Sequence, residues 1–155
     1  MNDYYARKWV DGSFATKSDR EAEDLVKRTV EVAWGCELHK YADFDHVDFW
    51  LEHGNRTGAY IEVKSRSVTS DTYPDVFLNL CKWYSLIDIS VRTDVPAYFF
   101  VCFADCIKYI NVALVDAREL EIGGCSHRVK SENDREPVIM VPISDMETMD
   151  KCLAE

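Results

Sequence analysis

The 155-residue sequence lacks long apolar runs and an excess of positive charge. No apolar run approaches the ~20 residues needed to cross a bilayer, and the first residues form no apolar signal core. We therefore expect a soluble, cytoplasmic protein with no membrane contact. The formal net charge of −10 argues against a broad nucleic-acid-coating surface, because such binding depends on neutralising phosphates. A local basic groove is still compatible with this charge, since metal ions can supply positive charge at a reaction site.

Paired cysteine motifs are missing as well. The six cysteines include no Cys-X-X-Cys pair, and a zinc site would need more ligands at finger-like spacing. Several of them fall within apolar runs, so we expect buried free thiols and a reducing compartment. The sequence also shows no repeats, no low-complexity tract, no phosphate-cradling glycine loop and no convincing Ser/His/Asp arrangement.

The composition that is present is that of an ordinary globular protein, with 47% apolar and 30% charged residues. A chain of this length can bury a sizeable core, so we expect a single domain over residues 1–155.

The most informative stretch is 46–67, which predicts two strands joined by a Gly/Asn turn at 53–58. Side chains alternate between the two faces of a strand. The second strand therefore places Ile61 and Val63 on one face, and on the other face a mostly charged set: Tyr60, Glu62, Lys64 and Arg66. The first strand divides in the same way, with Val47, Phe49 and Leu51 set against His46, Asp48 and Trp50.

Three charged side chains, Asp48, Glu62 and Lys64, can converge if the two strands pair in the right register. A slip of one residue would move a side chain to the other face. Asp45 is the rival carboxylate, but it shares its parity with the apolar set, so we favour Asp48. A solvated, charged strand face is the alternative interpretation of the same three residues.

An acid followed, about one hairpin later, by Glu62-Val63-Lys64 resembles the signature of the PD-(D/E)XK nuclease superfamily. Among the lysines of the chain, only Lys64 has an acid two positions before it. The resemblance implies an α/β fold, with a restriction-endonuclease-like α-β-β-α-β core in which helices flank a central mixed sheet. This core would span residues 18–115, and residues 116–155 would form a C-terminal elaboration.

The first helix of such a core is predicted from a capping box at 18–21 to a stop at Gly35. Its buried stripe has helical spacing and comprises Ala22, Leu25, Val26, Thr29, Val30 and Ala33. Glu23 lies beside the stripe, in an Ala-Glu context similar to that of the superfamily glutamate that reaches the metal site. The alternative is a surface pair with Lys27, four residues away.

A second amphipathic helix is predicted to follow Pro74, with an apolar face of Val76, Phe77, Leu80, Cys81 and Tyr84. Its other face carries Lys82, the best candidate for a contact to the substrate phosphate, although a solvated lysine is the alternative. Strands are predicted at 97–103, 107–115 and 137–143, with a loop-rich segment at 116–136 and a final short helix opening at 144–147.

Two carboxylates held close together repel each other, by about 4 kcal/mol at 4 Å with an effective dielectric near 20. A hard divalent cation removes this penalty. The resemblance implies that Asp48, Glu62 and the backbone carbonyl of Val63 bind Mg²⁺ or Mn²⁺. Lys64 would orient the attacking water or stabilise developing charge, Glu23 would reach a second metal or a water, and Lys82 would contact the phosphate.

The expected function is that of a divalent-metal-dependent nuclease hydrolysing phosphodiester bonds, in DNA rather than RNA, of a phage or junction-resolvase type. One alternative is a catalytically inactive module on the same fold that binds nucleic acid or protein. Another is an interaction protein whose acidic surface engages a basic partner. A homodimer is also expected from the resemblance, with an exposed Trp50 or Trp83 as a possible contact.

Overall fold

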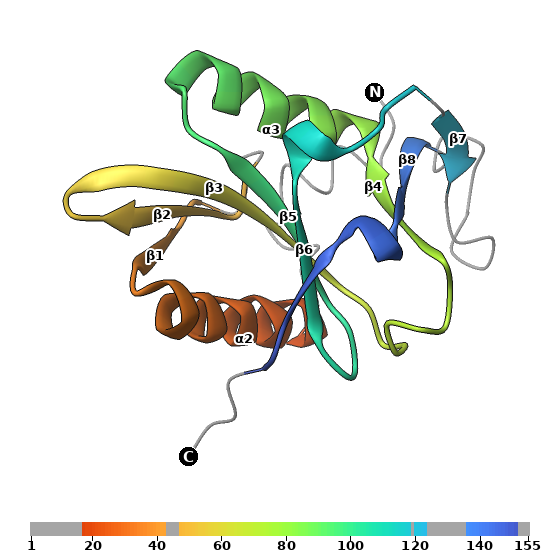
Figure 1. Ribbon diagram of the computed structural model, residues 1–155, viewed down its shortest axis with the longest axis horizontal. Helices are drawn as coiled ribbons and strands as arrows, with labels where there is room; N and C mark the ends of the chain where they lie inside the picture. Colours follow the sequence, from red (N-terminus) through yellow and green to blue (C-terminus); the bar gives the residue numbers. More distant parts are fainter. Residues whose placement is uncertain (1–16, 43–46, 119, 124–135, 152–155) are drawn as a thin grey trace.

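The computed structural model describes residues 17–42, 47–118, 120–123 and 136–151. Two helices and two sheets make up this part of the chain (Figure 1). The helices are α2 (Lys17–Trp34) and α3 (Leu80–Thr93), and two 3₁₀ turns occur at Val112–Leu114 and Ile143–Asp145. No described helix has both the length and the apolar character that a membrane crossing requires.

The larger sheet has six strands in the order β1-β2-β3-β5-β6-β9. In chain order these are β1 (Glu37–Lys40), β2 (Phe49–His53), β3 (Arg56–Ser65), β5 (Ala97–Cys102), β6 (Ile107–Asn111) and β9 (Glu147–Met149). The central pair β3–β5 is parallel and its neighbours pair antiparallel, so the sheet is mixed. The smaller sheet has the order β4-β8-β7, with β4 (Asp75–Asn79), β7 (Leu120–Gly123) and β8 (Glu136–Pro142).

Helix α2 covers one face of the large sheet, and α3 lies on the opposite side (Figure 1). The stripe predicted for α2 is confirmed at Ala22, Val26, Thr29 and Val30, which pack towards the sheet, whereas Ala33 is exposed. The helix begins at Lys17, one residue before the predicted cap, and ends before Gly35, whose φ of 61° is the left-handed conformation expected at a helix end.

The two faces of the sheet bury separate apolar clusters. Phe49, Leu51 and Ile61 belong to the cluster under α2, whereas Tyr60 and Val47 belong to the cluster shared by α3 and the small sheet. The predicted alternation is therefore confirmed within β2 and β3 but wrong for Val47. This residue lies in a bend before β2 begins, where the pleat of a strand does not impose alternation.

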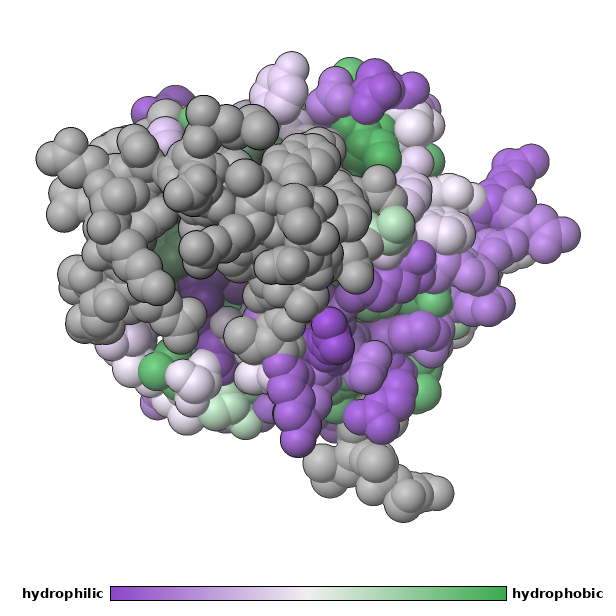
Figure 2. Space-filling model, turned by 180° about the vertical axis from the view of Figure 1, so that it is seen from behind, coloured by the Kyte–Doolittle hydropathy of each residue, from purple (hydrophilic) through white to green (hydrophobic). Residues whose placement is uncertain are grey.

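The hairpin turn is tighter than predicted. His53 pairs with Arg56, so Gly54 and Asn55 form a two-residue turn, and both have positive φ, at 57° and 63°. Such a turn matches the right-handed twist of the flanking strands. Figure 2, seen from behind, shows hydrophilic side chains on the side of the molecule where this hairpin lies. The β2–β3 register pairs Phe49 with Ile61, which fixes the position of the residues that come just before and just after.

The structure differs from the prediction at several elements. Residues 75–79 form strand β4 and not the first turn of a helix, because Val76 and Leu78 alternate into the core while the strand pairs with β8. The final helix is only a 3₁₀ turn at Ile143–Asp145, followed by β9. Strand β1 has no predicted counterpart. The strands predicted at 97–103 and 137–143 are confirmed as β5 and β8. The strand predicted at 107–115 is shorter, because β6 ends at Asn111 and a 3₁₀ turn follows at Val112–Leu114.

The cysteine prediction is confirmed only in part. The four described cysteines are free thiols, but Cys102 alone is buried; Cys36 and Cys106 are half-buried and Cys81 is exposed. Cys125 and Cys152 lie outside the described residues.

Candidate active site

Asp48 lies immediately before β2, beside Glu62 of β3, because the next residue, Phe49, pairs with Ile61. Its backbone N–H donates to the Ile61 carbonyl at 3.1 Å, and its carboxylate Oδ2 accepts the Val63 N–H at 2.8 Å. The carboxylate thus occupies the edge of β3 that β2 leaves free. Backbone groups of alternate strand residues point to the same side. The carbonyl of Val63 therefore faces the same edge as the Asp48 carboxylate.

Glu62 is the one charged side chain among the described residues that is classed as buried, with an exposed fraction of 8%. Its Oε1 lies 3.0 Å from Nζ of Lys82, which comes from the first turn of α3. Its Oε2 is also buried but has no hydrogen-bond donor among the described residues. A buried carboxylate oxygen without a donor is unfavourable, so a proton or a cation is needed there.

The two carboxyl groups influence each other, since each is among the groups that shift the pKa of the other. Burial, and next the negative charge of Asp48, raise the pKa of Glu62 to about 8. Burial likewise raises the pKa of Asp48, against the opposing effects of the Val63 N–H and the Lys82 ammonium. Without a metal, this pair therefore retains a proton near neutral pH.

Lys82 interacts electrostatically with both Glu62 and Asp48. Burial alone would lower the pKa of its ammonium, but the Glu62 carboxylate outweighs burial and the pKa is raised. The first turn of α3 contains no acidic residue, and a lysine there is unfavourable next to the positive end of the helix dipole. The contact with Glu62 offsets this disadvantage. The structure thus pairs Lys82 with a carboxylate, whereas a solvated lysine was the alternative.

Lys64 lies on the same face of β3 as Glu62, as predicted. Its Nζ lies 3.8 Å from the centroid of the Phe77 ring, and the Arg66 guanidinium lies 4.6 Å from the same centroid. Phe77 belongs to β4, the strand that was predicted as helix, so the small sheet provides an aromatic support for two cations of β3.

Glu23 lies on the other side of this edge. It forms an ion pair with Lys40 of β1, not the pair with Lys27 that was the alternative; Lys27 instead pairs with Glu31. Burial raises the pKa of Glu23 and the charge of Asp48 adds to the rise, which places these two carboxyls in electrostatic contact. Glu23 is therefore near Asp48, with Lys40 as its direct partner.

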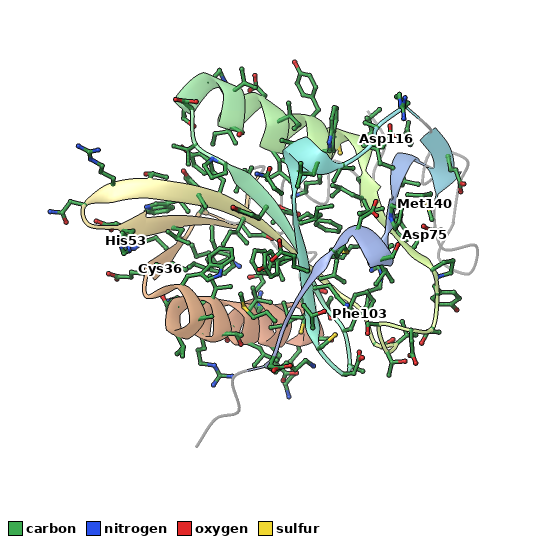
Figure 3. All side chains as sticks on the ribbon, viewed as in Figure 1. Cys36, His53, Asp75, Phe103, Asp116 and Met140 are labelled. Carbon is green, nitrogen blue, oxygen red and sulfur yellow. The ribbon has the colours of Figure 1, made fainter. Side chains whose placement is uncertain are left out.

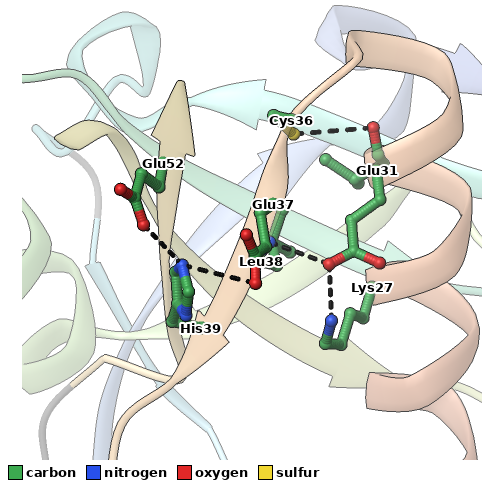
Figure 4. Close-up of polar contacts among 8 residues, drawn as sticks. Lys27, Glu31, Cys36, Glu37, Leu38, His39 and Glu52 are labelled. Atoms are coloured by element: carbon green, nitrogen blue, oxygen red, sulfur yellow. Dashed lines mark hydrogen bonds and ion pairs between the residues drawn. The ribbon is translucent and has the colours of Figure 1, made fainter. Parts of the chain in front are cut away.

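A second group of metal-ligand side chains lies away from these residues. Glu37 and His39 of β1 and Glu52 of β2 bring one ligand atom each to within 4.8 Å of one another, and His39 Nε2 is 2.7 Å from Glu52 Oε2 (Figure 4). Among the described residues, no other set of three brings its ligand atoms within 4.8 Å of one another. Glu23, Asp48 and Glu62 are therefore not as close together as this. The exposed fractions are 70%, 30% and 37% for the side chains of Glu37, His39 and Glu52, so water and salt screen this group.

The expectation of an exposed tryptophan is wrong for both candidates. The Trp50 ring stacks on His39 with centroids 4.9 Å apart and also contacts Tyr41 at 4.6 Å. Trp83 packs against the core and its Nε1 is buried. Neither residue is an exposed dimer contact, and the homodimer stays a prediction. Asp45, the rival carboxylate, lies outside the described residues.

The residues that sequence reasoning missed are Lys40, Arg66 and Phe77. Arg66 carried a usable signal, because it continues the alternation of Glu62 and Lys64 along β3. Lys40 and Phe77 carried none, since β1 and β4 were not predicted as strands.

A mixed sheet between two helices, with an acid before β2 and Glu62-Val63-Lys64 on β3, defines a protein of the PD-(D/E)XK nuclease fold. The chain belongs to the family described as "Phage putative PDDEXK endonuclease", whose model matches residues 10–149. This confirms the predicted superfamily.

The solved structures give the same fold. The structure of Hjc, a Holliday junction resolvase from the archaeal hyperthermophile Archaeoglobus fulgidus, matches with a TM-score of 0.51 and 16% identity, over 80% of this chain and 85% of that chain. At this identity the likeness shows the fold, and it confirms the predicted restriction-endonuclease-like class. A comparison with curated protein sequences finds no match for the chain.

Proposed function

We propose that the protein is a divalent-metal-dependent endonuclease that hydrolyses phosphodiester bonds in DNA. The observation that carries the proposal is the Asp48–Glu62 pair, in which a buried carboxylate oxygen of Glu62 has no donor. An exposed, solvated strand face would leave both carboxyls hydrated, with no reason for their pKa values to rise. The pair, as folded, needs a positive species beside it.

The donor set fits a hard cation. Asp48, Glu62 and the Val63 carbonyl offer oxygen atoms at one strand edge, and oxygen is the ligand that Mg²⁺ and Mn²⁺ prefer. When bound there, such an ion would supply an acidified water and neutralise charge on the phosphate. The Val63 N–H keeps the Asp48 carboxylate in place for this role.

The remaining residues act around this set. Lys64 is proposed to hold the attacking water or to stabilise charge on the phosphate, because its ammonium lies on the same strand face as Glu62. Lys82 holds the Glu62 carboxylate through Oε1, and its ammonium is proposed to contact a phosphate oxygen of the substrate. Glu23 contributes a third carboxyl near Asp48, with Lys40 offsetting its charge.

The substrate must approach a protein with a net charge of −10. Lys64, Arg66 and Lys82 lie on one side of the sheet and supply local positive charge. Such charge favours nucleic-acid binding because it neutralises phosphates. We propose DNA as the substrate on the basis of the endonuclease family to which the chain belongs.

The test is cleavage of labelled DNA by the purified protein in the presence of Mg²⁺ or Mn²⁺. We expect Glu62→Ala and Lys64→Ala to lower the cleavage rate by about a hundredfold to a thousandfold, since each removes a group that acts on the reacting phosphate. Glu52→Ala is the matched control, an acid on the neighbouring strand that lies outside the set.

Equal activity in Glu62→Ala, Lys64→Ala and the wild type would exclude this mechanism. Binding of DNA by the wild type without any metal-dependent cleavage would support the catalytically inactive module instead.

A further inference from the structure

A pocket of about 390 Å³ lies between the small sheet and the end of β3. Its walls are mostly apolar, and polar groups come from Arg66, Ser67, Tyr73 and Asp75. The residues that matter here are Arg66, Tyr73, Phe77, Phe103, Met140 and Ile143. Figure 3 labels Phe103 and Met140, together with Asp75, in this part of the molecule. The volume falls within the ~300–1,000 Å³ range of small-molecule sites, so one planar ring system fits and a duplex does not.

The pocket is continuous with the candidate active site. Phe77 lines the pocket, and its ring also carries the Lys64 ammonium at 3.8 Å. Glu62, Lys64 and Arg66 project from the same face of β3. The alternation continues as far as Arg66, because the N–H groups of Tyr60 and Arg66 both donate towards β5, to the carbonyls of Pro96 and Cys102. Whatever enters the pocket therefore lies next to the group that is proposed to act on the phosphate.

Arg66 lines the pocket and has an unmet hydrogen-bonding requirement. Its Nη1 donates to the Ser65 carbonyl at 3.1 Å, but its Nη2 is buried and has no hydrogen-bond partner among the described residues. An unpaired guanidinium donor in a mostly apolar pocket is unfavourable, and a ligand with acceptor atoms would satisfy it. The aromatic walls and this donor select a flat, partly polar molecule.

We propose that the pocket binds one unstacked nucleobase of the nucleic-acid strand that the active site cleaves. Tyr73, which is exposed, supplies the aromatic surface on which the base stacks, Phe77 lines the wall beside it, and Arg66 donates to an acceptor on the base edge. This inference rests on the nuclease function proposed above, and it makes the pocket a determinant of substrate choice. Strands with a mismatched or single-stranded nucleotide enter more easily, since less stacking and pairing are lost.

The position of the base relative to the cleaved bond follows from strand geometry. Arg66 lies four residues beyond Glu62, or about 13 Å along an extended strand. A stacked nucleic-acid strand rises about 3.4 Å per nucleotide. The captured base therefore lies within about four nucleotides of the scissile phosphate.

The test uses the full chain and single-stranded DNA that carries 5-iodouracil at one position at a time, irradiated in EDTA and digested with trypsin. Cleavage after Arg66 and Lys82 gives peptide 67–82, which contains both Tyr73 and Phe77. We expect the crosslink in this peptide, for one or two label positions only. Peptide 83–92, with Trp83 and Tyr84, is the internal control.

Fluorescence anisotropy on the same oligonucleotides adds a matched pair of variants. Tyr73 and Tyr84 are 62% and 64% exposed, so neither substitution empties the core. We expect Tyr73→Ala to weaken binding about tenfold, in line with the loss of one stacked base, and Tyr84→Ala to leave it unchanged. An abasic nucleotide at the crosslinking position should weaken wild-type binding to a similar degree and have little further effect on Tyr73→Ala.

Crosslinks confined to other peptides, no crosslink at all, or equal binding by the two tyrosine variants would overturn the proposal. Cleavage with Mn²⁺ is measured in parallel. Crosslinking at peptide 67–82 without cleavage keeps the pocket and removes the nuclease, whereas cleavage without that crosslink removes the pocket alone.

Discussion

Strands β1, β2 and β3 bring acidic side chains together in two places, and the two groups differ in their surroundings. Asp48 and Glu62 meet at the edge where β2 begins, under α3, with Glu62 only 8% exposed. Glu37, His39 and Glu52 meet across β1 and β2, where Glu37 and Glu52 are directly opposite each other. The second group brings three ligand atoms within 4.8 Å, and the first does so for no set of three among the described residues.

The two groups differ in hydration, and not only in how close their ligand atoms lie. In the exposed group, water hydrates each carboxylate, so its charge needs no partner. In the buried pair, the same charges lose their hydration, and their pKa values rise until a proton, a lysine or a cation compensates. Burial therefore distinguishes Asp48 and Glu62 from the exposed group, and it is the reason why we propose this pair as ligands of a divalent ion.

The largest expected difference between the two groups is in the pH dependence of stability. The pKa of Glu62 rises from 4.5 to about 8 on folding. Between these values the folded protein binds more protons than the unfolded chain, so the free energy of unfolding falls as the pH rises. Without metal, we expect a loss on the order of 3 kcal/mol from pH 5 to pH 8.

Urea denaturation in EDTA at several pH values measures this loss. Glu62→Gln should remove most of the slope, because glutamine imitates the protonated acid, whereas Glu52→Gln should keep it. If the free energy of unfolding depended on pH equally in Glu62→Gln and the wild type, Glu62 would be ionised in the folded protein. The buried pair would then not be the group that binds the extra proton.

The next effect is stabilisation by metal. With Mn²⁺ at ten times its dissociation constant, we expect the free energy of unfolding to rise by about 1.4 kcal/mol at pH 8, seen as a higher melting temperature. Glu62→Gln should abolish most of this rise and Glu52→Gln should not. The reverse pattern would place the ion at Glu37, His39 and Glu52.

The smallest effect is expected for the exposed group itself. Glu52→Gln removes the partner of His39, but surface ion pairs contribute little, so the free energy of unfolding should change by about 0.5 kcal/mol or less at pH 7. Urea denaturation of the variant and the wild type, side by side, measures it. A loss of more than 2 kcal/mol would mean that this group is a structural element of the hairpin.

Much of the fold was predictable because its signals are local. The stripe of α2, the alternation of β2 and β3, and the apolar run of β5 each follow from the period of one element. Strand β4 was mistaken for helix because Val76, Phe77 and Leu80 fit helical spacing, whereas Val76 and Leu78 fit strand alternation, and only the pairing with β8 decides in favour of a strand. β1 and β9 have four and three residues, too few for a periodic signal.

The candidate site divides in the same way. Glu62, Val63 and Lys64 are neighbours in sequence, so their motif and their faces could be read directly. The choice of Asp48 over Asp45 depended on parity. Parity failed for Val47 in the same bend, so the choice could not be secured from the sequence. The partners of these residues, Lys82 for Glu62 and Lys40 for Glu23, come from other elements and follow no local rule.

The sequence by itself determined the order of the core elements and the identity of the Glu62-Val63-Lys64 motif, since both are written within single helices and strands. Tertiary structure alone decided that Glu62 is buried, that its Oε2 lacks a donor, and that Phe77 lies under both Lys64 and Arg66. The physical reason is that desolvation depends on everything packed around a group. For Glu62 that surrounding comes from α3, β2 and β5, which are distant in the chain.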